Sequence, residues 1–447
     1  MESLRVSSYL IDTKLEDSNQ HMLIHGYTGA IDLVQDELAI FLSTTSTSFS
    51  KEDMPCSDTT AKLLEERGYI TKKTQDEERM ATALHRKDRI LNACFTFLIT
   101  YNCNFRCPYC FEKDAVHDQM RQKVFTKEMV DKAYEAILKI EPREQLRVKT
   151  IELYGGEPLL KENKEIVRYI VLRGKELGFR FSAVTNGYDL DAYVDLLSPD
   201  LIYNVQITID GIKEFHNQRR IHYAGYPTFD TIVNNIGIAL KKGVRVVVRV
   251  NTDKNNFNDL QLLTNFFDNL NYTDDILFKI SSALLRDNGG ISNDKLNYFS
   301  QKEFMEAHQK LKFRYGCQDY GVYKRIYTAI TKQTPLYFRS AFCGAQVNGF
   351  VFDPFGKIYP CWEIVGKTNY QIGDYNKENI VWNNSVLAKW REHDILSLTS
   401  CRHCKYALLC GGGCAAHNLD KVTHCTNMAV ILNYVVNLAF RNVIKNN

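Results

Sequence analysis

The chain has 447 residues, of which 45% are hydrophobic and 24% charged, so it is large enough for two or three globular domains. The 56 Lys and Arg residues nearly balance the 53 Asp and Glu residues, and a net charge of +3 excludes the basic footprint of a nucleic-acid-binding protein. The longest apolar run, residues 428–440, is too short to span a bilayer and predicts a buried helix. The first residues mix charge and polarity, so we expect no secretory signal peptide, no membrane partner and a cytoplasmic location.

The first 85 residues predict a small α+β domain of winged-helix type, in which short strands precede helices. Gly26 and Gly29 interrupt two strand-like segments. A helix-like segment ends at Gly68, a residue type that often terminates helices, and a short strand follows it. This region contains no dense group of cysteines.

Residues 86–310 alternate between β-rich runs and helix-like segments, which predicts βαβ units and a parallel sheet. The number of strands suits an α/β fold, specifically a partial (β/α)6 barrel of TIM type. Short polar or glycine-rich motifs follow the first four strands, at the end of the strands where such barrels carry their chemistry. The six predicted strands lie within residues 93–100, 148–155, 179–187, 201–210, 243–252 and 275–283.

The chain has 13 cysteines, and in a reducing cytoplasm closely spaced cysteines favour metal or cluster ligands over disulfides. Cys103, Cys107 and Cys110 follow the first barrel strand with the spacing C-x3-C-x2-C. A zinc site would need a comparable second cysteine pair, and the barrel region has none. An iron–sulfur cubane normally takes four cysteines, so three would leave one iron free.

The segment "CNFRCPYC" resembles the cluster loop of the radical S-adenosylmethionine (SAM) superfamily. In that superfamily the free iron binds the amino and carboxylate groups of SAM. An electron from the cluster then cleaves SAM to a 5′-deoxyadenosyl radical, which abstracts a hydrogen atom from the substrate. The resemblance makes Cys103, Cys107 and Cys110 the catalytic cluster ligands.

The resemblance also assigns the SAM-binding residues. Tyr109 takes the aromatic place near the adenine, and the "GGEP" motif binds the SAM amino group. Asn217 stands where an Asp is more usual in the segment that ends at Arg220. The remaining assignments are contacts to the SAM carboxylate or ribose, and the complete set is Tyr109, Gly155, Gly156, Glu157, Pro158, Thr185, Asn186, Thr208 and Arg220.

Residues 311–447 are loop-rich and carry a second cysteine group. Its spacing includes C-x2-C-x5-C-x3-C and resembles the seven-cysteine SPASM domain, although the "CRHC" pair alone would also suit a zinc ribbon. The resemblance implies two auxiliary [4Fe–4S] clusters, and therefore three clusters in all. The distal cluster would be held by Cys401, Cys404, Cys410 and Cys425, and the one nearer the barrel by Cys343, Cys361 and Cys414.

The nearer auxiliary cluster has only three cysteines in this pattern. Some relatives place a fourth cysteine where this chain has Gly349. Either Cys317 supplies the fourth ligand, or the iron stays open for a substrate thiolate. Cys56 and Cys94 lie outside both groups, and we expect them to be buried thiols.

SPASM proteins resemble one another in modifying peptides or proteins. We expect a maturase of ribosomally made peptides that forms a thioether (sactionine-like) or carbon–carbon crosslink, with a flavodoxin- or ferredoxin-type electron donor. Residues 1–85 faintly resemble leader-recognition domains, which implies that they bind the leader of a precursor peptide, although a plain extension packed on the barrel is the alternative.

Two other functions compete with the maturase. The first is an anaerobic sulfatase-maturing enzyme, whose relatives carry an Asp directly after the second SPASM cysteine. Here Trp362 and Glu363 follow Cys361 instead. The second is an iron–sulfur redox or sensor protein, which would have no need of a "GGEP" motif.

Overall fold

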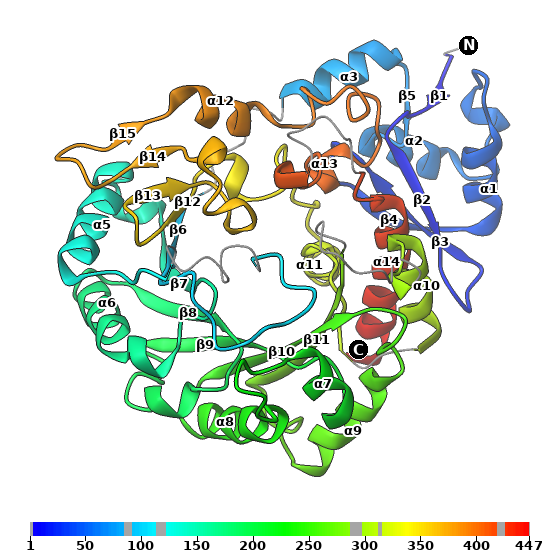
Figure 1. The fold of residues 1–447 in the computed structure, drawn as a ribbon. Helices are drawn as coiled ribbons and strands as arrows, with labels where there is room; N and C mark the ends of the chain where they lie inside the picture. Colours follow the sequence, from blue (N-terminus) through cyan, green and yellow to red (C-terminus); the bar gives the residue numbers. More distant parts are fainter. Residues whose placement is uncertain are drawn as a thin grey trace.

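The computed structural model describes residues 3–84, 92–112, 122–286, 297–311, 315–417 and 425–446. The predicted domain boundary between residues 85 and 86 lies outside these ranges. The main feature is a ten-stranded sheet in the order β11-β10-β9-β8-β7-β6-β12-β13-β14-β15, which curves into an open barrel (Figure 1).

Six consecutive parallel strands form the barrel, and all six strands predicted from the sequence are confirmed. Helices lie on the outer side of this wall (Figure 1), so the α/β fold with a partial (β/α)6 barrel is also confirmed. The strands are β6 Ala93–Leu98, β7 Arg147–Tyr154, β8 Arg180–Thr185, β9 Ile202–Thr208, β10 Arg245–Thr252 and β11 Phe278–Leu284. The helices are α5 Lys127–Ile140, α6 Lys164–Glu176, α7 Lys213–Arg219, α8 Phe229–Lys241 and α9 Asp259–Asn269.

The side chains of each barrel strand alternate between two environments. On β7, Ile151 and Leu153 are fully buried in the apolar layer beneath the helices, whereas Glu152 and Tyr154 face the interior. Strand β10 repeats the pattern, with apolar Val248 and Val250 alternating with polar residues. The outer layer therefore supplies the core, and polar side chains are directed to the interior.

The C-terminal region continues the barrel sheet. Strands β12 (Gly349–Phe352) and β13 (Lys357–Tyr359) form a hairpin, and β12 pairs in parallel with β6 at the barrel's edge. No local pattern in the sequence predicts this pairing. The elements of the region are β12 Gly349–Phe352, β13 Lys357–Tyr359, β14 Gly373–Asp374, β15 Val381–Trp382, α12 Asn384–Glu392 and α13 Ala407–Cys410.

The N-terminal region contains an antiparallel sheet in the order β2-β3-β4 and a separate β1–β5 pair. The predicted end of a helix at Gly68 is confirmed, since this residue closes α2 with a φ of 93°, a left-handed conformation that suits glycine. The elements are β1 Arg5–Val6, β2 Leu10–Lys14, β3 Gln20–His25, β4 Ile31–Gln35, α1 Asp36–Thr44, α2 Asp58–Arg67, β5 Ile70–Thr71 and α3 Gln75–Leu84.

The C-terminal helix α14 (Met428–Asn446) joins the N-terminal sheet to the rest of the chain. It packs against α10 (Gln301–Leu311) and α11 (Val322–Lys332), and the three helices share one apolar core with β2 and β3 (Figure 1). Within the described ranges, no helix is long and apolar enough to cross a membrane. The expected boundary between residues 310 and 311 falls inside α10 and remains a prediction.

The buried side chain of Asn437 fixes α14 to the end of β2. Its Oδ1 accepts a hydrogen bond of 2.8 Å from the Glu16 N–H, and its Nδ2 donates one of 3.2 Å to the Lys14 carbonyl. We expect Asn437→Ala to reduce the local stability of this junction by about 1–3 kcal/mol, because two partly buried hydrogen bonds to the backbone are lost. Amide hydrogen exchange at Glu16 measures the change. Asn433→Ala, an exposed position on the same helix, is the control, and equal exchange in both variants would contradict the assignment.

Candidate functional site

A cavity of about 390 Å³ lies inside the barrel and gathers nearly all the residues predicted to bind the first cluster and SAM. Pro158, the exception, is buried and does not line the cavity. Of the predicted residues, those that line the cavity are Cys103, Cys107, Tyr109, Cys110, Gly155, Gly156, Glu157, Thr185, Asn186, Thr208 and Arg220.

The glycine motif after β7 lies directly against the backbone that leads into the cysteine loop. Gly155 has a φ of 140°, and a Cβ built on it would lie 2.3 Å from the Thr100 carbonyl oxygen. A Cβ on Gly156 would lie 2.4 Å from the Asn102 oxygen. Both contacts exclude a side chain. The Gly156 N–H donates to the Thr100 carbonyl at 3.0 Å, so the glycines allow two segments of the site to pair closely.

Glu157 is the centre of a buried hydrogen-bond network. Its carboxylate accepts from the Thr185 hydroxyl at 2.6 Å, the Asn186 N–H at 2.6 Å and the Leu159 N–H at 2.9 Å. Burial raises the pKa of Glu157 to about 7, while these three donors lower it and so partly oppose the burial. The carboxylate thereby holds the end of β8 beside the glycine motif.

Tyr109 extends from the cysteine loop across the cavity to the end of β9. Its hydroxyl donates to a carboxylate oxygen of Asp210, and Nη1 of Arg220 donates to the same hydroxyl at 3.3 Å. The Nε atom of Arg220 is buried and has no hydrogen-bond partner among the residues that the structure describes. A guanidinium with a buried, unused donor suits an anionic ligand group.

The barrel interior also contributes polar residues that the sequence analysis missed. Five of them occupy inward positions of strands whose alternate residues are apolar, a period-two pattern that could have identified them, whereas Glu112 follows the cysteine loop and Arg286 follows β11. Burial raises the pKa of Glu152 to about 7 and lowers the pKa of the Arg249 guanidinium. The missed barrel residues on the cavity wall are Glu112, Glu152, Tyr154, Gln206, Arg249, Asn251 and Arg286.

Two residues of the C-terminal region, Trp362 and Glu363, complete the same cavity. The Trp362 ring stacks on Tyr154 of β7, with centroids 5.4 Å apart and planes 24° apart. Glu363 lies 2.8 Å from His417, measured from Oε2 to Nε2. The cavity is therefore built jointly by the barrel and by the segment that follows Cys361.

None of the 13 cysteines forms a disulfide, and those of the C-terminal region lie in two neighbourhoods. Burial raises the pKa of the Cys361 thiol, and the charges of Cys343 and Cys414 raise it further. Burial likewise raises the pKa of Cys401 to about 11, with contributions from Cys410, Cys404 and Cys425. The resemblance to the SPASM domain implies the same two sets as separate ligand groups, and their role as cluster ligands remains a prediction.

The remaining three cysteines lie outside these sets. Cys317 is buried in the core formed by α10, α11 and α14, where its sulfur lies 3.9 Å from that of Met305. Cys56 packs at the side of the N-terminal core. Cys94, at the start of β6, is close to the segment after Cys343, because a Cβ on Gly344 would lie 2.9 Å from its sulfur.

Comparison with known proteins identifies the class. Residues 97–266 match the model of the radical SAM superfamily. The cysteine-type anaerobic sulfatase-maturating enzyme of Clostridium novyi (strain NT) is 21% identical, over 73% of this chain and 88% of that enzyme.

Two solved structures resemble the chain over most of their length. The structure of native anSMEcpe with bound AdoMet and Cp18Cys peptide has a TM-score of 0.55 and 18% identity, covering 79% of this chain and 98% of that one. SuiB of Streptococcus suis bound to the precursor peptide SuiA has a TM-score of 0.55 and 11% identity, and the match covers 96% of this chain and 99% of the SuiB chain.

The chain therefore contains a radical SAM domain and is an enzyme of the radical SAM class. Its fold is similar to that of the peptide-bound SuiB and anSMEcpe structures, and the similarity to SuiB covers 96% of the chain. The predicted classification is confirmed.

Glu157→Gln tests the network at the centre of the site. The amide keeps the shape of the side chain, but its NH2 group would face a backbone or hydroxyl donor, leaving that donor without an acceptor. We expect a loss of about 1–3 kcal/mol in stability, seen as a lower thermal midpoint and weaker binding of SAM in titration calorimetry. Glu165→Gln, at an exposed position, is the control. A Glu157→Gln protein with unchanged midpoint and SAM affinity would show that the network contributes nothing.

Proposed function

We propose that this enzyme is a radical SAM maturase that acts on a ribosomally made precursor peptide and forms a thioether or carbon–carbon crosslink in it. The observation that carries the proposal is the single cavity that joins the cysteine loop, the glycine motif and the C-terminal residues Trp362 and Glu363. A peptide residue that enters this cavity would lie between the SAM-binding wall and the auxiliary-cluster region.

The residues present suit a [4Fe–4S] cluster and SAM. Cys103, Cys107 and Cys110 offer three thiols that are not in disulfides, and the buried Nε of Arg220 offers a donor for the SAM carboxylate. The Gly155–Gly156 backbone offers a close approach for the SAM amino end. When bound, the cluster and SAM supply radical chemistry that removes a hydrogen atom from the substrate. The protein positions the substrate and excludes water.

Two auxiliary clusters complete the proposed cofactor set of three. Cys343, Cys361 and Cys414 would hold the nearer one, and the four-cysteine set, Cys401, Cys404, Cys410 and Cys425, the distal one. Cys425 of the distal set is exposed, so the distal cluster would be accessible to a flavodoxin- or ferredoxin-type partner.

The N-terminal sheet is proposed to bind the leader of the precursor peptide at the free edge of β4. The opposite edge strand, β2, is covered by α14 through Asn437, whereas β4 has β3 as its one strand neighbour among the described residues. The His25 N–H donates to the Ala30 carbonyl, so these two residues form a hydrogen-bonded pair. Hydrogen-bonded and non-hydrogen-bonded pairs alternate along an antiparallel ladder. In this register Leu33 is at a non-hydrogen-bonded position, and its N–H faces outward. An extended peptide can add to such an edge as a further strand.

The second candidate is a sulfatase-maturing enzyme, and Glu363 is the observation that favours it. Its carboxylate lines the cavity although it lies two residues after Cys361 rather than directly after it. To separate the two candidates, the enzyme is given a cysteine-containing sulfatase peptide and a peptide encoded beside its own gene. A crosslinked product, which has lost a pair of hydrogens, supports the maturase, and an aldehyde product trapped by a hydrazine supports the sulfatase enzyme.

The triple variant Cys103→Ala, Cys107→Ala, Cys110→Ala tests the assignment of the first cluster. We expect formation of 5′-deoxyadenosine from SAM and dithionite to fall to the level without enzyme, while about two thirds of the iron stays bound in the auxiliary clusters. Anaerobic iron analysis and chromatography measure both quantities. Cys56→Ala, outside all three cysteine sets, is the control, and SAM cleavage by the triple variant would refute the assignment.

Leu33→Pro tests the leader site. Proline removes the outward N–H but leaves the β3–β4 hydrogen bonds in place, because Leu33 is at a position that does not pair through its N–H. We expect the Kd for the precursor peptide, measured by fluorescence anisotropy, to rise about tenfold, the effect of losing roughly 1.4 kcal/mol. Leu33→Ala keeps the N–H and should bind normally. Equal affinities for both variants would exclude this edge as the site.

A further inference from the structure

The nearer auxiliary set has three cysteines, and a side chain beside Cys414 can complete it. This inference rests on the proposed function, in which Cys343, Cys361 and Cys414 hold a [4Fe–4S] cluster. A cubane has four irons, so one of them needs a ligand other than these cysteines.

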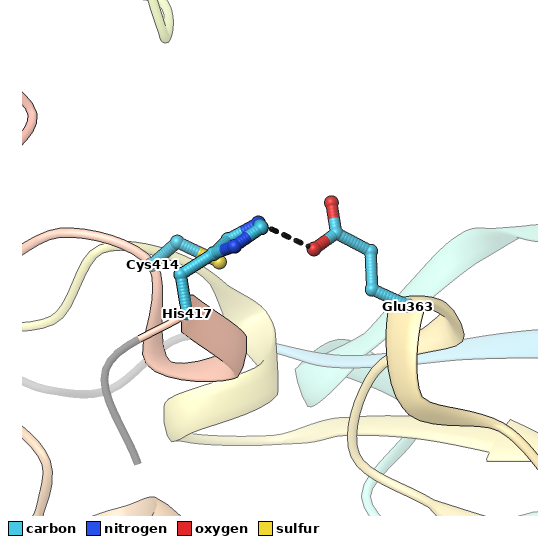
Figure 2. Close-up of side chains that lie close together, drawn as sticks. All are labelled: Glu363, Cys414 and His417. Atoms are coloured by element: carbon cyan, nitrogen blue, oxygen red, sulfur yellow. Dashed lines mark ion pairs between the residues drawn. The ribbon is translucent and has the colours of Figure 1, made fainter. Parts of the chain in front are cut away.

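His417 lies one short 3₁₀ turn beyond Cys414. The spacing C-x2-H places both side chains at the end of one tight loop, as in the short knuckles that chelate metals. Cys414, His417 and Glu363 each offer one ligand atom, and these atoms lie within 4.8 Å of one another. Figure 2 shows the three side chains directed to the same region.

Glu363 is placed to orient the His417 ring. Its Oε2 lies 2.8 Å from Nε2 of His417, as the dashed line in Figure 2 marks. Histidines that bind metals usually have a carboxylate or carbonyl partner at the other ring nitrogen, which fixes the tautomer and strengthens the ligand. With Nε2 toward Glu363, Nδ1 is the nitrogen left for a metal.

The other available thiols fit less well. Cys317 is packed against Met305 in the helical core, away from this group. Cys94 is near the Cys343 segment, but it lies on β6 and is not part of the group formed by Cys414, His417 and Glu363.

We propose that His417, through Nδ1, is the fourth ligand of the nearer auxiliary cluster and that Glu363 holds its ring in place. The cluster would then have no open iron for a substrate thiolate. Histidine in place of cysteine raises the reduction potential of iron–sulfur centres, as in Rieske proteins, so this cluster would accept electrons more readily than an all-cysteine one.

The test uses the full chain with Cys103, Cys107 and Cys110 changed to Ala, so that the C-terminal clusters alone remain. The protein is produced with ¹⁵N-histidine, reconstituted with iron and sulfide under anaerobic conditions, reduced with dithionite and examined by pulsed EPR. We expect a strong hyperfine coupling from one directly bound ¹⁵N nucleus. His417→Ala and His417→Cys should both remove it, and His417→Cys should keep the full iron content.

Two matched controls use other residues near the clusters. His403→Ala changes the exposed histidine between Cys401 and Cys404 and should keep the nitrogen coupling. Glu363→Gln should keep the coupling but shift it, because the ring loses its carboxylate partner. A nitrogen coupling that survives in His417→Ala would overturn the proposal.

The outcomes separate this inference from the function on which it rests. About eight irons per chain without nitrogen coupling would overturn the histidine ligand alone and leave the three-cluster enzyme standing. A change in the EPR signal of Cys94→Ala in that case would assign the position to Cys94. A triple variant that binds no cluster would overturn the auxiliary clusters, and the histidine ligand with them.

Discussion

The parallel pairing of β12 with β6 is the contact on which the site depends. Four residues, Gly349 to Phe352, align with Cys94 to Phe97, and the rings of Phe350 and Phe352 pack on Phe95. This pairing attaches the C-terminal region to the open edge of the barrel as a continuation of one sheet. Because β13 returns antiparallel to β12, the chain re-emerges at Cys361 beside the cavity. Without this pairing, Trp362 and Glu363 would not face the barrel interior.

The local signals in the sequence were sufficient for most of the barrel. Each strand is a run of β-branched and aromatic residues followed by a turn, and each cysteine group has a spacing within a few residues, so both can be recognised without knowledge of the fold. The inward polar residues were also encoded, as at Arg249 and Asn251 on β10, but their pattern identifies a face and not the partners across the cavity.

Contacts between distant segments could not be predicted in the same way. The β12–β6 pairing joins residues about 250 positions apart, and no local pattern specifies which edge a short strand will choose. The same holds for Glu363 and His417, which meet through a hairpin and a 3₁₀ turn that the cysteine spacing does not describe. Cys317 shows the converse, because its position in sequence suggested a ligand, but its side chain belongs to the helical core.

The shared apolar core of β2, β3 and α14 would influence which residue of a bound peptide is modified. Ile11, Met22 and Ile24 are packed in the same apolar cluster as Ile431 and Val435, so the N-terminal sheet is held at a fixed position relative to the barrel. A peptide anchored at the edge of β4 would therefore reach the cavity across a constant gap. The number of residues between its anchored part and its reactive part, rather than the residues themselves, would then select the position that is modified. The junction would therefore set the length of peptide between the anchored leader and the modified residue.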